Sequence, residues 1–211
     1  LNIALANNFS QQFNNVINED MTNIGLSLSP NAPTLYNVDG SLNWQNNTFT
    51  NPIASTLATY QNDTKQISNS LNVSYQLFPN INFNINSGFN YQNFEEFNLR
   101  PHTRYNPAFN FTSSNGSSTF TSSFSSFSYN VEPQITGDFV LGRNKVSVLL
   151  GATVNSLESK QSSIQGSGFE SNALMMNINA AKTKIFSDII STDYKYIAAF
   201  GRINYQFDSK Y

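Results

Sequence analysis

The chain has 211 residues, of which only 11% are charged, with 11 basic and 13 acidic side chains, one His and no Cys. The missing Cys excludes a disulfide framework, a thiolate metal site and a cysteine nucleophile. A net charge of -2 without a basic run predicts no nucleic-acid partner. Because few residues are charged, the chain owes much of its polarity to uncharged side chains, above all 33 Asn. An aromatic content of 14% argues against disorder, and no apolar run approaches the roughly 20 residues of a membrane-spanning helix.

Apolar and polar side chains alternate with a period of two along much of the chain. The alternation is clearest at 81–91, where Ile and Phe alternate with Asn, and at 127–141. Successive side chains of a strand point to opposite faces, so this pattern indicates strands with one apolar and one polar surface. The sequence predicts an all-β, antiparallel, up-and-down fold with six strands, near 1–13, 67–77, 81–94, 123–141, 145–161 and 193–207.

The connections between these strands alternate between two lengths. Short turns with Pro, Gly or Asn are predicted at 78–80 and 142–144, and a third at 208–210. The long connections span 14–66, 95–122 and 162–192. Short turns at one end and long loops at the other are typical of outer-membrane β-barrels, whereas such loops are uncommon in a compact soluble domain. Within the last loop, the stretch 172–182 has helical propensity, which predicts a short helix with an exposed Met pair available to a partner.

The polar face of the predicted strands is rich in neutral side chains. In a membrane barrel such a face lines the lumen while the apolar face contacts lipid, and aromatic residues near strand ends suit the membrane interface. Pro133 lacks a ladder donor, which predicts a β-bulge there. A soluble β-sandwich, or a secreted β-rich adhesin or glycan-binding module, stays open as the alternative. The residues expected to face the lumen are Asn82, Asn84, Asn86, Asn90, Asn130, Gln134, Arg202 and Asn204.

Three stretches resemble a known family in the same order along the chain. They are APTLYNVDGSL at 32–42 followed by NPIA at 51–54, NVSYQLFPNINF at 72–83, and YIAAFGRINYQFDSKY at 196–211, which is the most specific. Together they resemble the SusC/RagA-type TonB-dependent outer-membrane transporters of Bacteroidota. The resemblance implies a barrel of about 22 strands, an N-terminal plug domain, a TonB box and a SusD-like lipoprotein lid.

Six strands are too few to close such a barrel, so we expect the chain 1–211 to be a piece of the barrel, with the plug and the TonB box outside it. The expected location is the outer membrane. The expected function is active import of oligosaccharides or peptide-sized nutrients, with the chain supplying barrel wall and extracellular loops. Expected partners are outer-membrane lipid, the SusD-like lid, TonB through the missing region, and the oligosaccharide or peptide substrate.

No residue pattern predicts catalysis, a metal site or a cofactor, so we do not expect an enzyme. His102 lies in a long loop between two Arg, where a solvated side chain is the simpler interpretation and an anion contact the alternative. The first long loop combines aromatic rings with neutral amides, which suits a hydrophilic uncharged ligand. The candidate substrate contacts are Tyr36, Trp44, Asn46, Asn47 and Tyr60; packing against neighbouring loops or the lid is the alternative for each.

Overall fold

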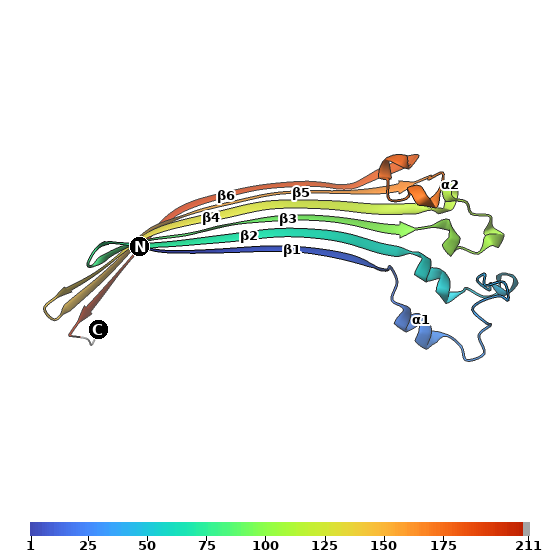
Figure 1. Cartoon of the computed structure of the whole chain (residues 1–211), viewed down its shortest axis with the longest axis horizontal. Helices are drawn as coiled ribbons and strands as arrows, with labels where there is room; N and C mark the ends of the chain where they lie inside the picture. The colour runs from blue at the N-terminus through green and yellow to red at the C-terminus, as the bar shows by residue number, and fades with distance from the viewer. Residues whose placement is uncertain (209–211) are drawn as a thin grey trace.

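The computed structural model describes residues 1–208, and it confirms the all-β, antiparallel, up-and-down fold. A single six-stranded sheet follows chain order from β1 to β6, so each strand pairs with its neighbours in sequence (Figure 1). Every pairing is antiparallel. The strands are β1 (Asn2–Ile17), β2 (Thr59–Phe78), β3 (Ile81–Arg100), β4 (Ser118–Leu141), β5 (Asn144–Ser167) and β6 (Thr183–Phe207).

All strands continue further toward the long loops than the sequence pattern predicted. The connections shrink accordingly to 18–58, 101–117 and 168–182. The predicted boundaries were too short because the alternation of apolar and polar residues fades before the backbone pairing ends. In β4, for example, the part from Ser118 to Ser126 is rich in Ser and Thr on both faces, yet it stays paired with β3 and β5.

The two short turns that the sequence predicts are confirmed. Pro79 and Asn80 join β2 to β3, with a register shift beside Phe78. Gly142, whose φ of 64° favours glycine, begins the turn from β4 to β5. Of the third predicted turn, Asp208 donates its backbone N–H to the carbonyl of Arg143 at 2.8 Å. Residues 209 and 210 lie outside the described part of the chain.

The bulge predicted at Pro133 is wrong. Pro133 pairs in register with Ile85 of β3. On the β5 side the pairs at Glu132 and Pro133 are missing, but the register is the same on both sides of the gap, from Val131 to Gln134. The ladder therefore skips the missing donor without inserting a residue. A bulge occurs elsewhere, between β5 and β6 beside Ser163.

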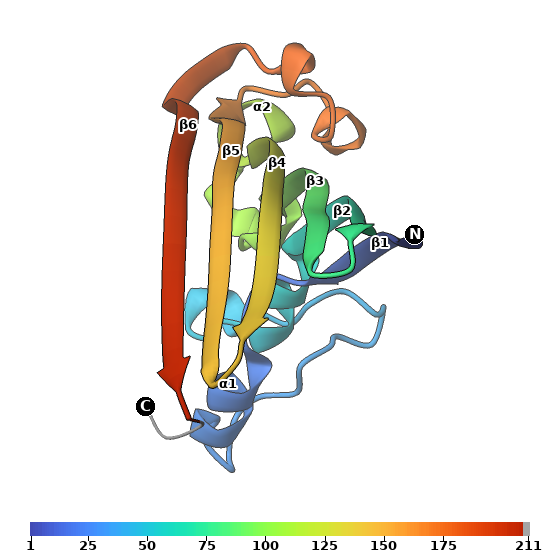
Figure 2. The ribbon, with the colours of Figure 1, turned by 90° about the vertical axis from the view of Figure 1, so that its left-hand side faces the viewer.

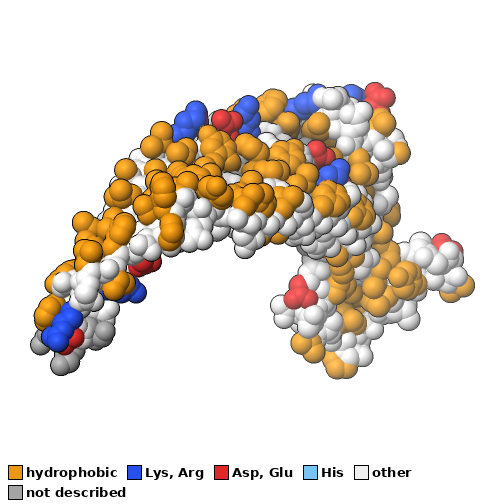
Figure 3. All heavy atoms as spheres, turned by 60° about the vertical axis from the view of Figure 1, so that its left-hand side comes forward, with side chains coloured by type: hydrophobic (Ala, Val, Ile, Leu, Met, Phe, Trp, Pro, Cys, Tyr) orange, Lys and Arg blue, Asp and Glu red, His pale blue; other side chains and the backbone are white. Residues whose placement is uncertain are grey.

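The sheet is arched, with two faces of opposite character. Figure 2 shows the six strands side by side, and Figure 1 shows the long connections gathered at one end of the strands and the short turns at the other. In Figure 3 hydrophobic side chains gather on the convex side of the arch. The register places all eight residues that the sequence assigned to a lumen on the opposite, polar face; for example, Asn84 pairs with Gln134, and Asn204 with Ser147.

Short helices occupy the long connections. None of the helices in the described part of the chain is long and apolar enough to cross a membrane. The helix predicted within 172–182 is wrong: this stretch forms two 3-10 turns instead. The elements are α1 (Met21–Ser27), α2 (Ser113–Gly116), and the 3-10 turns η1 (Gln45–Asn47), η2 (Pro52–Leu57), η3 (His102–Arg104), η4 (Pro107–Phe109), η5 (Asn172–Leu174) and η6 (Ile178–Ala180).

The small apolar core lies at the loop end of the sheet. Phe169, Met175 and Ala181 are buried together, and Leu99 of β3 packs against them. Met175 is therefore a core residue and not part of an exposed pair, although its neighbour Met176 is half exposed. The 168–182 connection thus folds back onto the end of the sheet.

Candidate functional site

The apolar face of the sheet forms a band of limited height. On β3 it runs from Ile81 to Tyr91, which is close to the 9–11 residues of a tilted transmembrane strand. These side chains stay open to the surroundings: Ile203 in the band on β6 is 74% exposed. Moving along each strand toward the long loops, the last apolar residues of the band are Phe13, Ile67, Tyr91, Phe127, Val154 and Ile197, for β1 to β6 in turn.

This upper limit descends toward the turns in two steps, between β1 and β2 and between β4 and β5. Elsewhere it is level, because Ile67 pairs with Tyr91, Tyr91 with Phe127, and Val154 with Ile197. Phe13 on β1 pairs with Asp63, so the band reaches further toward the loops on β1 than on β2. At the other side, Val154 pairs with Val131, so on β5 the band ends nearer the turns than on β4. A flat apolar layer crossed by tilted strands gives a net descent of this kind from β1 to β6, because the layer meets the strands at residues that shift in one direction across the sheet.

Aromatic and polar side chains border the band. Phe127 lies 6.2 Å from both Phe89 and Tyr129, between ring centroids, so three rings gather near the upper limit. Just beyond it on the same face the side chains become polar or charged, as at Lys65 and Lys160. Aromatic rings followed by charges are the sequence of groups expected at a membrane interface.

A cavity lies among the long connections at the loop end, and a small hairpin forms its first wall. Tyr36 and Leu42 form an isolated antiparallel bridge. The turn between them contains Gly40 at φ 82° and Asp39, whose Oδ1 accepts from the backbone N–H of Ser41 at 2.9 Å and from its hydroxyl at 2.7 Å. These hydrogen bonds, first that of the Ser41 hydroxyl, lower the pKa of Asp39. The Asp-Gly turn therefore fixes this wall locally.

Asn51 holds the hairpin to the next part of the loop. Its side chain is 1% exposed. The amide NH₂ donates to the carbonyls of Leu35 and Asn43, and the amide oxygen accepts from the N–H of Ile53 at the start of η2. The two stretches 32–42 and 51–54, which carry part of the family resemblance, are thereby joined through one buried amide.

The segment between these two stretches has an unusual backbone. Gln45, Asn46 and Asn47 all have positive φ, at 42°, 55° and 71°. Left-handed conformations are costly for residues with a Cβ, and Asn tolerates them best. Neighbouring hydrogen bonds hold this segment: the N–H of Gln45 donates to Oδ1 of Asn43 at 2.9 Å, and Thr48 donates to the carbonyl of Gln45.

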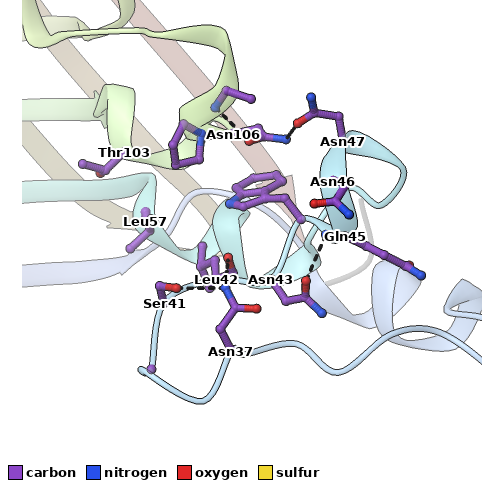
Figure 4. A pocket seen from close by; sticks show the side chains of 14 residues that line it. Asn37, Ser41, Leu42, Asn43, Gln45, Asn46, Asn47, Leu57, Thr103 and Asn106 are labelled. Atoms are coloured by element: carbon purple, nitrogen blue, oxygen red, sulfur yellow. Dashed lines mark hydrogen bonds between the residues drawn. The ribbon is translucent and has the colours of Figure 1, made fainter.

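Together these pieces line an open cavity of about 950 Å³, which is large enough for a sizeable ligand. Figure 4 shows its side chains converging from the first and second long connections. The structure brings Trp44, Asn46 and Asn47 into its lining, three of the five candidates from the sequence. Their contact with a substrate stays a prediction.

The other two candidates lie elsewhere. Tyr36 is 51% exposed and belongs to the hairpin bridge outside the cavity lining. Tyr60 lies at the loop end of β2, where its hydroxyl donates to Glu96 at 2.8 Å and accepts from Asn62 at 3.2 Å. Both tyrosines therefore have local structural partners.

The sequence missed the contribution of the second long connection to this cavity. Asn106, which is 7% exposed, accepts from the N–H of Ala108 at the start of η4 and donates to Oδ1 of Asn47 (Figure 4). Asn106-Pro107 repeats the Asn-Pro start of η2. That repeated turn signal was visible in the sequence, but nothing in it indicated that the two turns meet.

The side chain of His102 is half-buried and hydrogen-bonded, so it is not the solvated side chain that the sequence favoured. Its Nδ1 lies 3.0 Å from Oδ1 of Asn172, and Ser113 and Ser117 donate to the same oxygen at 3.0 and 2.7 Å. Arg104 pairs instead with Glu19 at 3.3 Å. His102 therefore joins the second long connection to the third.

Comparison with known proteins gives a likeness in structure only. No family model and no curated protein matches the chain. It is similar to chains in solved structures of the RagAB peptide transporter (TM-score 0.68, 17% identity) and of the RagAB peptide importer in the "open-open" (0.66, 17%) and "closed-closed" (0.67, 16%) states. In each case the match covers 98% of this chain and 24% of the other.

This likeness shows a shared fold. The chain therefore has the architecture of a segment of these transporter chains and spans about a quarter of their length.

Proposed function

We propose that this chain is part of the wall and outer loops of an outer-membrane importer of the TonB-dependent SusC/RagA type, which takes up oligosaccharides or peptide-sized nutrients. The observation that supports it most is the exposed apolar band, whose upper limit descends from β1 to β6. A soluble β-sandwich or adhesin would have to cover these side chains with a second layer, and among residues 1–208 none lies over the band.

In this proposal the polar face lines the lumen. Neutral amides such as Asn84 and Gln134 make this wall hydrophilic with few fixed charges, Glu132 and Arg202 among them, which suits the passage of hydrophilic molecules. The apolar band contacts outer-membrane lipid, and the long connections face the outside. The structural likeness to RagAB chains supports a lipoprotein partner of the SusD type at the loops. Energy would reach the transporter through TonB and a plug domain.

Uptake by cells tests this proposal. The full-length protein would be expressed with its lipoprotein partner in an outer-membrane-bearing host that lacks related importers. We expect accumulation of labelled oligosaccharides or peptides, and its loss in a host that lacks TonB. Equal accumulation with and without TonB, or a full-length protein that fractionates as soluble, would contradict the proposal.

A further inference from the structure

The loop cavity is lined without a single charged side chain among the described residues. Its lining consists of amides, hydroxyls, aliphatic groups and one indole. The nearest charges are already engaged: Asp39 accepts two hydrogen bonds within its own turn, and Arg104 pairs with Glu19. A ligand in this cavity therefore contacts neutral hydrogen-bonding groups and apolar surface, and no lining residue can form an ion pair with it.

Trp44 supplies the flat apolar surface. The indole is half-buried in the lining, so one part is held by the protein and another faces the cavity. Among residues 1–208 its ring N–H has no hydrogen-bond acceptor, so this donor is free for a ligand. A ring with an apolar face and a polar edge is suited to partners that share this mixture.

The amides around Trp44 divide into two groups. Asn43, Asn51 and Asn106 use their side chains to hold the loop together. The exposed side chains of Gln45 and Asn46 make no hydrogen bond within the described part of the chain, although both line the cavity. Each offers both donors and acceptors.

The left-handed backbone places Asn46 beside the indole, and the exposed side chain of Gln45, which extends away from the ring in Figure 4, has no hydrogen bond among residues 1–208 that holds it in position. Positive φ at Gln45 and Asn46 is unfavourable for such residues, and strained backbone of this kind concentrates at ligand sites. Asn106 holds the segment in place through Asn47. The backbone that carries Gln45 and Asn46 is therefore fixed next to the half-buried indole by the surrounding loops before any ligand arrives.

We propose that this cavity binds uncharged sugar residues of an oligosaccharide. The apolar face of a sugar ring stacks on Trp44, while its hydroxyls exchange hydrogen bonds with Gln45 and Asn46. A peptide is a poorer fit, because no charged group in the lining pairs with its termini or charged side chains. This inference deepens the proposed function and rests on it for the transport of the saccharide. The binding of the saccharide in the cavity does not depend on transport.

Trp44 is the only tryptophan of the chain, which gives a local probe. The full-length protein, in detergent, would be labelled with 5-fluorotryptophan and the Trp44 resonance assigned by its loss in Trp44→Phe. Maltoheptaose, cellohexaose and mannohexaose are the neutral ligands. Tri-galacturonate and a decapeptide of Ala, Ser and Lys are the charged comparisons.

We expect a neutral oligosaccharide to shift the Trp44 resonance saturably, at concentrations where the charged comparisons leave it unchanged. Asn46→Gly removes the amide and keeps a residue that adopts positive φ, so it should weaken this binding about tenfold through the loss of one or two hydrogen bonds. The matched control is Asn23→Ala, an exposed amide on α1 outside the cavity, which should bind as the unaltered protein does.

The inference is overturned by any of three results: none of the neutral oligosaccharides shifts the resonance, the decapeptide or tri-galacturonate binds equally tightly, or Asn46→Gly binds the saccharide like Asn23→Ala. Its failure is distinguishable from that of the proposed function. If the protein takes up peptide in a TonB-dependent way and no saccharide shifts the Trp44 resonance, only the saccharide site is rejected. Saccharide binding at Trp44 without TonB-dependent uptake would reject the import function alone.

Discussion

The two ends of the sheet are stabilised in different ways. At the loop end the chain covers its own apolar groups, and Phe169, Met175 and Ala181 are buried by their own connection. At the turn end a larger apolar area stays open, with Ile197 77% and Ile203 74% exposed. The loop end therefore has a small core of its own, although Phe186 and Ile189 of β6 stay exposed there. In the proposed function, lipid covers the apolar area at the turn end.

The largest effect should follow from removing the loop end's own cover. Phe169 is fully buried, and Phe169→Ala should destabilise the 168–182 connection by about 3–5 kcal/mol through lost burial and the cavity left behind. Hydrogen exchange of that connection in the full-length protein measures it. Leu174→Ala, which truncates a side chain that is 40% exposed, is the control and should change exchange little. Equal effects of both would show that the connection has no core.

The second largest effect is expected from a charge placed in the apolar band. Ile85→Lys puts a cation near the middle of the band on β3 and should lower the free energy of unfolding in lipid vesicles by about 2–4 kcal/mol. Its sequence neighbour gives the matched control: Asn86→Lys lies on the polar face and should cost far less. Urea titration of both proteins decides, and similar losses would argue against lipid at the band.

Two glycines compare the ends of the sheet through the same substitution. A Cβ on Gly166 would lie 2.5 Å from Ile178 and 3.0 Å from Ala181, so Gly166→Ala should cost about 1–3 kcal/mol by overpacking beneath the connection. A Cβ on Gly151 would meet the ring of Phe200 at 2.5 Å, but that ring lies on the open polar face. Gly151→Ala should therefore cost less, because the ring can turn away. Thermal unfolding in detergent measures both, and the reverse order would contradict the comparison.

The smallest effect concerns the start of α1. Asp20 caps this helix, and the backbone N–H of Thr22, donating at 2.8 Å, lowers the pKa of Asp20, with a further contribution from the Thr22 side chain. A lowered pKa in the folded state adds stability above the ordinary pKa near 3.8, and that stability is lost as pH falls through the folded value. Exchange of the α1 amides should rise in this acid range beyond its intrinsic change, and Asp20→Asn should remove that extra rise.

Much of the sheet could be predicted because period-two alternation encodes both a strand and its two faces. The eight polar-face residues from Asn82 to Asn204 needed only parity within each strand. The strand ends could not be predicted, because toward the loops Ser and Thr occupy both faces and the alternation fades, as between Ser118 and Ser126. The bulge predicted at Pro133 was wrong because the hydrogen-bond ladder between β4 and β5 can skip one missing N–H donor without an inserted residue.

The cavity could be predicted only in part. Trp44, Asn46 and Asn47 are close in sequence, so composition alone grouped them. Asn106 could not be found in this way, since it reaches the cavity from a different connection. The helix expected within 172–182 failed because burial of Met175 against the sheet, and not local propensity, decides how that stretch folds.

The central claim is that the band contacts lipid while the opposite face does not. Spin labels placed one at a time along β6 from 197 to 207, in the full-length protein in lipid vesicles, test it most directly. We predict high collision rates with oxygen at odd positions such as Ile203, and with a water-soluble nickel reagent at even positions such as Asn204. Above the band, spin labels at Thr192 and at Asp193 should both collide more often with the nickel reagent than with oxygen. Equal accessibility of both parities within 197–207 would contradict the account.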